Sequence, residues 1–279
     1  MLTWIRTELY KMTRRPRSYI GLGAIAALVL LIEFAMYVDG EDYLKFILQQ
    51  LEAYFTIEGN VLNGYTVCFV ILQTLILQMP LLVALITGDA LSGEAALGTL
   101  RFMLATPVSR TGLVLAKYLA GSVYVAVLLL FLGVLALYGS MALFGTGDLI
   151  ILKSESLIIL KEADIHWRFL SAFMLAFVSL SVIAALSMML SAFSNNSIGP
   201  IVLSMAIVIV FTIIGSLEFP LFDSIRPFLF TSYMTVWRDM FDDPLQTSGI
   251  IRSVLVLILH IVVFLSVAIF HLNKKDIQV

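Results

Sequence analysis

Residues of the kinds that carry out catalysis are few in this sequence and lie far apart. The three histidines, His166, His260 and His271, fall in separate segments, and Cys68 is the only cysteine. The sequence contains no His-Glu-x-x-His, Gly-x-Ser-x-Gly or Cys-x-x-Cys motif, the spacings that would form a zinc site, a nucleophile elbow or a redox pair. We therefore expect no enzyme and no metal site.

Two of these residues lie in apolar runs and have plain structural interpretations. We interpret Cys68 as a small buried apolar side chain. His260, near the middle of an apolar stretch, is interpreted as an interhelical hydrogen-bonding residue, with a proton or substrate contact as the alternative.

The phosphate-binding motif Gly-x-x-x-x-Gly-Lys-Ser/Thr is also absent. This chain is therefore expected to bind no cofactor and to hydrolyse no ATP in the P-loop manner. If ATP drives its activity, ATP and Mg²⁺ must bind to a separate subunit.

Three polar residues inside apolar stretches are candidates for lining a pathway. Glu33 is the only carboxylate within such a stretch, and an ionisable residue there is a functional candidate. Its position near the end of the stretch equally allows its side chain to reach the lipid headgroups. Gln73 and Gln78 could line the same pathway or join neighbouring helices by hydrogen bonds.

The elements that position these residues are expected to be membrane helices. The chain has 279 residues, of which 61% are hydrophobic and only 13% charged, and its mean hydropathy is +1.02. Soluble domains have about 45–50% apolar and about 25% charged residues. The net charge of −2 argues against a nucleic-acid partner.

Six stretches have the length of about 20 apolar residues that a membrane-spanning helix requires. We therefore predict an all-α membrane protein with one transmembrane permease domain over residues 1–279, with a kink at Pro80. The predicted spans are residues 18–38, 61–87, 115–144, 169–193, 198–217 and 250–270.

The distribution of lysine and arginine predicts the orientation. With the N-terminus inside, the inner segments carry ten basic against four acidic residues, and the outer segments carry seven basic against fourteen acidic residues. Basic residues concentrate on the cytoplasmic side, so both termini are predicted to be cytoplasmic.

Several connecting segments are also predicted to contact the membrane. Residues 1–17 form an interfacial amphipathic helix that turns into the bilayer at Pro16, and residues 42–55 form a helix on the outer surface. Residues 218–249 are too apolar for a solvated loop and are interpreted as an outer re-entrant or interfacial segment. The repeat at residues 149–153 and 157–161 is compatible with a hairpin or an interfacial helix, so the structure of the 145–168 loop stays open.

The most informative segment is residues 88–110, between the second and third spans. It predicts a short amphipathic helix that Ser92 could cap, with Glu94 in its first turn and a break at Pro107. Its apolar stripe is expected to pack against the helix ends or a partner; the stripe comprises Leu97, Leu100, Met103 and Leu104.

This segment resembles the corresponding stretch of ABC-2 type transporter permeases. The resemblance is carried by Gly93-Glu94, Gly98-Thr99-Leu100-Arg101, Leu104, Pro107-Val108-Ser109-Arg110 and Lys117, and it extends to the N-terminal helix, the six spans and the closing Asn273-Lys274-Lys275-Asp276-Ile277. About 25 residues carry the motif, whereas the layout matches over nearly the whole chain.

The resemblance implies the membrane-spanning subunit of an ATP-binding cassette exporter. The uninterrupted six-span layout, without a cleavable presequence, predicts a bacterial or archaeal plasma membrane. A second permease copy, or a related permease, would complete the pathway, and cassette ATPase subunits would bind from the cytoplasm. The resemblance assigns ATPase coupling to Glu94, Gly98, Thr99, Leu100 and Arg101, with Arg110 anchoring the following turn to lipid or to the ATPase. ATP binding would then move the coupling helices and switch the pathway between inward and outward exposure.

Three other classes of function are compatible with the sequence. An ATP-independent secondary transporter or channel is the main alternative, although the sequence shows no midplane charge cluster and no duplicated halves. A lipid-modifying enzyme and a non-transporting membrane scaffold are further alternatives. The transported substrate is not readable from the sequence, although the apolar outer segment favours an amphipathic or hydrophobic cargo.

Overall fold

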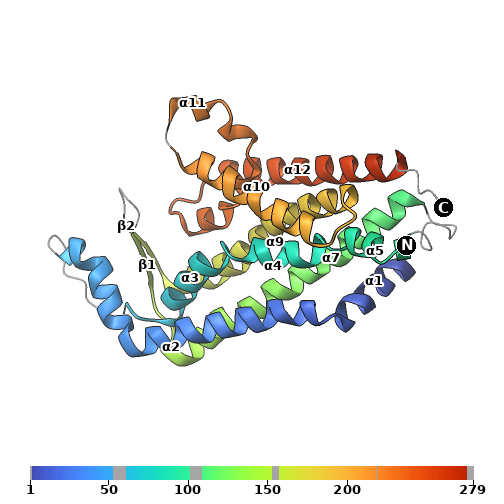
Figure 1. The fold of residues 1–279 in the computed structure, drawn as a ribbon. Helices are drawn as coiled ribbons and strands as arrows, with labels where there is room; N and C mark the ends of the chain where they lie inside the picture. Colours follow the sequence, from blue (N-terminus) through green and yellow to red (C-terminus); the bar gives the residue numbers. More distant parts are fainter. Residues whose placement is uncertain (1, 53–60, 101–108, 153–156, 218, 275–279) are drawn as a thin grey trace.

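The computed structural model describes residues 2–52, 61–100, 109–152, 157–217 and 219–274, with the side chains of 47–52 left out. Within these ranges the chain is mostly helical (Figure 1). Its elements are α1 (Leu2–Arg14), α2 (Pro16–Glu52), α3 (Gly64–Leu75), α4 (Met79–Thr87), α5 (Ser92–Ala96), α7 (Arg110–Gly133), the π-helix η1 (Val134–Gly139), α8 (Ser140–Phe144), β1 (Leu149–Leu152), β2 (Leu157–Leu160), α9 (Glu162–Phe193), α10 (Ile198–Ser216), α11 (Pro220–Asp223), the 3₁₀-helices η2 (Arg226–Phe228), η3 (Phe230–Tyr233) and η4 (Val236–Phe241), and α12 (Thr247–Lys274).

Five helical stretches are long and apolar enough to cross a membrane, or six if the bent pair α3–α4 is one span. They are Pro16–Phe46, Arg110–Phe144, Glu162–Phe193, Ile198–Ser216 and Thr247–Lys274. Many of their large apolar side chains are exposed on the outside of the bundle, which in water would be strongly unfavourable. These helices indicate a membrane-embedded protein.

The structure confirms the predicted kink in the second of the six stretches but places the break before Pro80. The helix breaks after Leu75, and α3 and α4 meet at an angle of 51°. Pro80 lies in the first turn of α4, where its missing N–H leaves no intrahelical bond unmade. The break therefore precedes the proline, which begins the second half of the bent pair.

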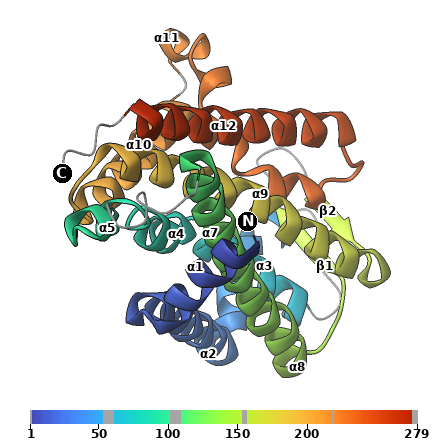
Figure 2. The ribbon, with the colours of Figure 1, turned by 90° about the vertical axis from the view of Figure 1, so that its right-hand side faces the viewer.

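Helix α9 is the centre of the bundle. It packs against α4, α7, α10, α12 and η4. Among the described helices of spanning length, α9 has the largest buried share of its most apolar stretch. Figure 1 shows α2 and α12 along opposite sides of the bundle, and Figure 2 shows α1 and α5 at the end that faces the viewer. We call this the terminal end, since α12 also finishes there.

The opposite end of the bundle carries a two-stranded hairpin. Strands β1 and β2 are antiparallel, with Leu149 opposite Leu160. The start of α3 is tied to the same region, because Asn63 Oδ1 accepts hydrogen bonds from the Tyr65 and Thr66 N–H groups while its Nδ2 donates to the Asp148 carbonyl at 2.8 Å. The repeated Leu-Ile-Ile-Leu segments thus form a hairpin, so the prediction of an all-α fold misses this small sheet.

Residues 219–246 form α11 and three 3₁₀-helices rather than a span. Phe230, Trp237 and Phe241 are almost fully buried, and η4 packs on α9 while η3 packs on α10 and α12. Prolines interrupt regular helix in this segment, and its aromatic side chains fill the space between the three long helices.

Three other boundaries differ from the predictions. The helix expected separately over residues 42–55 is continuous with α2 as far as Glu52, although Figure 1 shows that the later part of α2 turns away from its first part. The third predicted span begins earlier, at Arg110, because Ser109 caps it by accepting a hydrogen bond from the Gly112 N–H at 3.1 Å. The helix predicted within 88–110 is short, since α5 has five residues, and residues 101–108 lie outside the described ranges.

Candidate functional site

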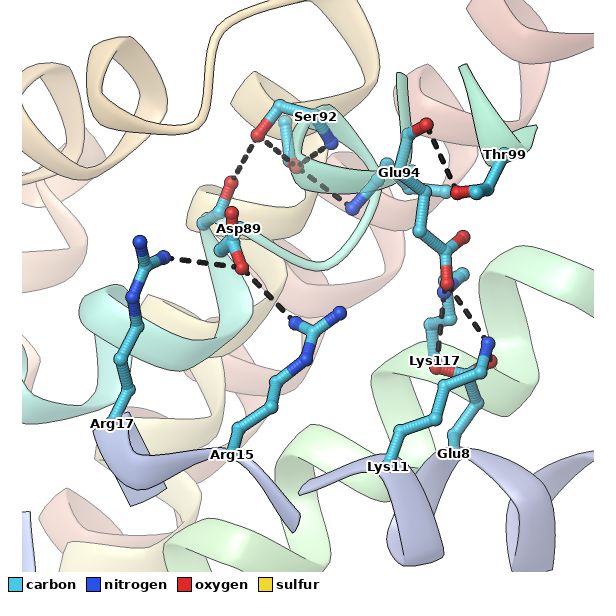
Figure 3. Close-up of polar contacts among 12 residues, drawn as sticks. Glu8, Lys11, Arg15, Arg17, Asp89, Ser92, Glu94, Thr99 and Lys117 are labelled. Carbon is cyan, nitrogen blue, oxygen red and sulfur yellow. Dashed lines mark hydrogen bonds and ion pairs between the residues drawn. The ribbon is translucent and has the colours of Figure 1, made fainter. Parts of the chain in front are cut away.

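The terminal end of the bundle brings together charged residues from three elements. Helix α1 packs on the start of α7, and α5 lies beside both, as the close-up in Figure 3 shows. The predicted helix in residues 1–17 is confirmed over Leu2–Arg14, and α2 begins at Pro16 as expected.

Glu8, Lys11, Glu94 and Lys117 form a closed ion quartet. Lys117 Nζ lies 3.0 Å from Glu8 Oε2 and 2.8 Å from Glu94 Oε1. Lys11 Nζ lies 2.8 Å from Glu8 Oε1 and 2.9 Å from Glu94 Oε1. The two carboxylates and two ammonium groups alternate, so each charge has opposite charges as its neighbours.

The quartet is largely removed from water. The side chains of Lys117 and Glu94 are 1% and 5% exposed, whereas Lys11 is 34% exposed and marks the rim. Burying such charges is tolerated only when each is paired, and removal of one partner leaves an uncompensated buried charge. The quartet therefore fixes α1, α5 and α7 relative to one another.

The charged states of Glu8 and Lys11, the two quartet residues on α1, follow from this arrangement. Burial favours the neutral carboxyl of Glu8, but the Lys117 ammonium and the hydrogen bonds from Lys11 and Lys117 outweigh burial, so the pKa of Glu8 is lowered. Burial likewise opposes the charge of Lys11, but hydrogen bonds to Glu8 and Glu94 outweigh it and raise the pKa of Lys11. Both groups are charged near neutral pH.

A second ion cluster joins the α1–α2 junction to the residues before α5. The buried carboxylate of Asp89 lies 3.0 Å from Arg15 Nη1 and 3.3 Å from Arg17 Nη1. A Cβ on Gly93 would clash with this carboxylate. Gly93 therefore allows α5 to pass directly over Asp89.

Ser191, near the end of α9, holds the beginning of α5. Its Oγ accepts hydrogen bonds from the Leu91 N–H at 3.0 Å and the Ser92 N–H at 2.9 Å. The first N–H groups of a helix have no acceptor within the helix itself, and here Ser191 of α9 provides that acceptor. Ser92 does not cap α5, which corrects the prediction; its hydroxyl donates to the Gly88 carbonyl at 2.8 Å.

The tip that follows α5 is exposed. Leu97 is 75% exposed, which departs from the expected apolar stripe, although Leu100 is buried in a cluster with residues of α7, α9 and α12. Gly98 has φ +72°, a left-handed conformation that ends the helix and suits glycine. Thr99 is exposed, and its hydroxyl donates to the Glu94 carbonyl at 3.2 Å.

The remaining two residues of the predicted coupling set are placed differently. Arg101 lies outside the described residues. Arg110 Nη1 donates to the carbonyls of Leu272 at 2.6 Å and Asn273 at 3.1 Å, at the end of α12. A cation at this position satisfies carbonyls that a helix C-terminus leaves unpaired.

The candidate pathway residues do not gather at this site. Glu33 is 4% exposed and accepts a hydrogen bond from Ser140 Oγ at 3.0 Å, so its side chain is buried against α8. Gln73 and Gln78 are exposed on either side of the break between α3 and α4. His260 places one ring nitrogen 2.8 Å from the Val256 carbonyl of its own helix and the other 3.1 Å from the Phe228 carbonyl of η2. The second contact joins two elements, as the interhelical interpretation predicts.

Sequence reasoning identified Glu94 but not the partners that hold it. Glu8 lies at helical spacing from Ile5 and Met12, on the apolar side of an otherwise basic helix. An acid on that side indicates a buried cationic partner, and this signal was available. The role of Ser191 had no comparable signal, since serines are common throughout α9.

No group of three His, Cys, Asp or Glu side chains is placed to hold a metal ion in the part of the chain that the structure describes. The chemistry of the terminal end is that of buried ion pairs and hydrogen bonds between elements.

Comparison with known proteins identifies the family. A family model described as "Protein of unknown function (DUF2705)" matches residues 24–278, so the chain belongs to this family. No curated protein matches the chain.

Proposed function

We propose that this member of the DUF2705 family is the permease subunit of an ABC-2 type exporter, driven by separate cassette ATPase subunits that bind at its terminal end. Two lines of support meet at the same residues. The motif around Glu94 and Gly98 resembles that of ABC-2 permeases, and the observation that carries the proposal is the buried attachment of this segment to the bundle.

The attachment makes the 88–100 segment suitable for transmitting force. The ion quartet ties Glu94 to α1 and α7, and Ser191 ties the start of α5 to α9, the central helix. A partner that displaces the exposed tip at Leu97 would therefore move three helix ends together. ATP would drive such a switch through its different affinities for the two states of the assembly.

The same proposal specifies the topology. With α3–α4 counted as one span, six spans place both termini on one side of the membrane, and the excess of basic residues assigns that side to the cytoplasm. The membrane would be a bacterial or archaeal plasma membrane. Cytoplasmic location of the terminal end is what ATPase binding requires.

Two permease copies would form the pathway. Gln73 and Gln78 support this, because exposed amide side chains beside a helix break are unfavourable in lipid and suit a polar pathway between copies. The exposed apolar faces of α10 and α12 are compatible with lipid or with the second copy.

A tip substitution tests the proposal without disturbing the buried quartet. The tagged chain would be purified from native membrane in mild detergent, and co-purifying cassette ATPase and its activity would be measured for the wild type and for Leu97→Glu. Leu221→Glu is the matched control, because Leu221 is 76% exposed, close to the 75% of Leu97, and lies on α11, outside the terminal end. We expect Leu97→Glu to lose most of the ATPase and the control to retain it.

Glu94→Ala gives the second readout. It keeps the exposed tip but removes the carboxylate that both lysines contact, so the ATPase is expected to bind while its activity becomes uncoupled from the permease. A chain that purifies without any ATPase from gently solubilised membrane would refute the exporter and favour an ATP-independent transporter, a channel or a membrane scaffold.

A further inference from the structure

A cavity of about 620 Å³ opens where α10 ends and α12 begins, outside the terminal end. Its wall is completed by the segment around η2 and η3. The lining residues are Thr212, Gly215, Ser216, Arg226, Pro227, Thr231, Ser232, Tyr233, Thr235, Gly249, Arg252 and Ser253.

The charged and hydroxyl-bearing side chains that line the cavity suit an anion. Two of its lining side chains are guanidinium groups, seven carry hydroxyls, and none of the described lining residues is acidic. Arg226 is partly compensated by Asp223, at 2.9 Å. Arg252 makes no hydrogen bond or ion pair with any residue that the structure describes, so its charge is available to a ligand.

Two buried polar atoms at the cavity have no hydrogen-bond partner among the residues that the structure describes. One is the hydroxyl of Thr231, which is 8% exposed. The other is Arg226 Nε, whereas Arg226 donates through Nη1 to Asp223 and through Nη2 to the Leu217 carbonyl. A buried donor without an acceptor is unfavourable, and an oxyanion in the cavity would accept from both groups.

The surroundings of the cavity are apolar and exposed. Ile213 on α10, Phe228 on η2, and Ile251 and Leu255 on α12 are all more than half exposed. A ligand whose charged group occupies the cavity could therefore lay acyl chains along α10 and α12. Soluble anions would gain nothing from this surface.

We propose that this cavity binds a phosphate ester, as the headgroup of an anionic lipid or of a lipid-like amphiphile. Arg252 and Arg226 hold the phosphate oxygens through charge-assisted hydrogen bonds, and Thr231 donates its hydroxyl. The headgroup lies at the ends of two helices of transmembrane length, where lipid headgroups are found. The proposal requires no ATPase and stands or falls separately from the exporter function.

The test uses the purified full chain in a neutral detergent. Native mass spectrometry would count retained molecules of phosphatidylglycerol, with phosphatidylcholine and glycerol 3-phosphate as comparison ligands. We expect phosphatidylglycerol to bind best. Phosphatidylcholine tests the requirement for net negative charge, and glycerol 3-phosphate tests whether a soluble phosphate ester suffices without acyl chains.

Two variants locate the binding. Arg252→Gln removes the cation that has no partner among the described residues and is expected to weaken phosphatidylglycerol binding about tenfold. Thr231→Val is expected to weaken binding several-fold while leaving the ligand-free thermal stability unchanged or raised, because it removes a hydroxyl that has no hydrogen-bond partner in the described part of the chain. Lys45→Gln is the control, since Lys45 is a 65% exposed cation on α2.

Each outcome decides the proposal. Preference for phosphatidylglycerol over both other ligands, lost in Arg252→Gln and Thr231→Val but not in Lys45→Gln, supports a lipid headgroup site. Glycerol 3-phosphate binding equally well, with the same dependence on Arg252, keeps the phosphate site and assigns it to a soluble ester. Equal binding of both lipids, or equal losses in the variants and the control, would overturn the proposal.

Discussion

Replacing Lys117 with methionine removes the most buried charge of the ion quartet. Methionine is apolar and of similar length, so the substitution chiefly deletes the ammonium group. Two contacts are lost, at 3.0 Å to Glu8 and 2.8 Å to Glu94. The two carboxylates are then left with only Lys11, which is one third exposed.

The expected loss of stability is large. Breaking a buried ion pair by removing one partner is unfavourable by about 3–5 kcal/mol, because the other charge stays buried without compensation. At about 2–4 °C per kcal/mol, this is a fall in Tm on the order of 10 °C. Lys45→Met is the matched control: Lys45 lies 3.9 Å from Glu41 and 3.7 Å from Asp42 with all three side chains exposed, a pairing that stabilises by about 0–1 kcal/mol.

The chain provides its own reporter for this measurement. Cys68 is the only cysteine and is 0% exposed, so a thiol-reactive fluorescent dye labels it only when the bundle opens. Thermal unfolding in detergent can therefore be followed by dye fluorescence for each variant. If Lys117→Met unfolds at the same temperature as Lys45→Met, the reasoning about a desolvated quartet is wrong.

A double variant separates charge from packing. Glu8→Gln together with Lys117→Met removes one charge of each sign and leaves the pair of Lys11 and Glu94 at 2.9 Å. If charge compensation is the cause, the double variant is more stable than Lys117→Met alone. A double variant that is less stable than either single variant would instead indicate lost packing.

Three further outcomes are expected from the terminal end. Ser191→Ala leaves two buried backbone N–H groups without an acceptor, each unfavourable by about 1–3 kcal/mol. The rate of amide hydrogen exchange at the start of α5 should therefore rise. An unchanged rate there would contradict the assigned hydrogen bonds. Gly98→Ala places a side chain at φ +72° and should lower the free energy of unfolding by about 1–2 kcal/mol, measured by dye-monitored unfolding. Gly23→Ala, at an open helical position, should be neutral or stabilising. Equal effects of the two substitutions would argue against the left-handed turn at Gly98. The pKa of Glu8 is lower in the folded state than its ordinary value of 4.5, so the unfolded state binds the proton first as the pH falls. The stabilisation from Glu8 is therefore complete above about pH 4.5 and is lost as the pH falls through the folded pKa. Glu8→Gln should lack this acid-dependent part of the plot of Tm against pH, and identical plots for the two proteins would count against the pairing.

Much of the membrane architecture was predictable because it depends on local sequence. A helix crosses lipid when about 20 successive residues are apolar, and this property needs no tertiary information. The start of α2 at Pro16 and the kink near Pro80 were predicted for a similar reason, since proline restricts the backbone wherever it occurs. The local pattern did not decide between hairpin and helix at residues 149–160, where pairing of two segments supplied the hydrogen bonds.

The sequence by itself determined that this chain is built from long apolar helices and that Glu94 and Gly98 belong to a distinctive connecting segment. Only the tertiary structure decided what holds this segment: Glu94 pairs with Lys11, 83 positions away, and Ser191 holds the start of α5 from another helix. The physical reason is that the stability of a buried charge or N–H group depends on the partner that folding brings within about 3 Å, and no local pattern specifies that partner.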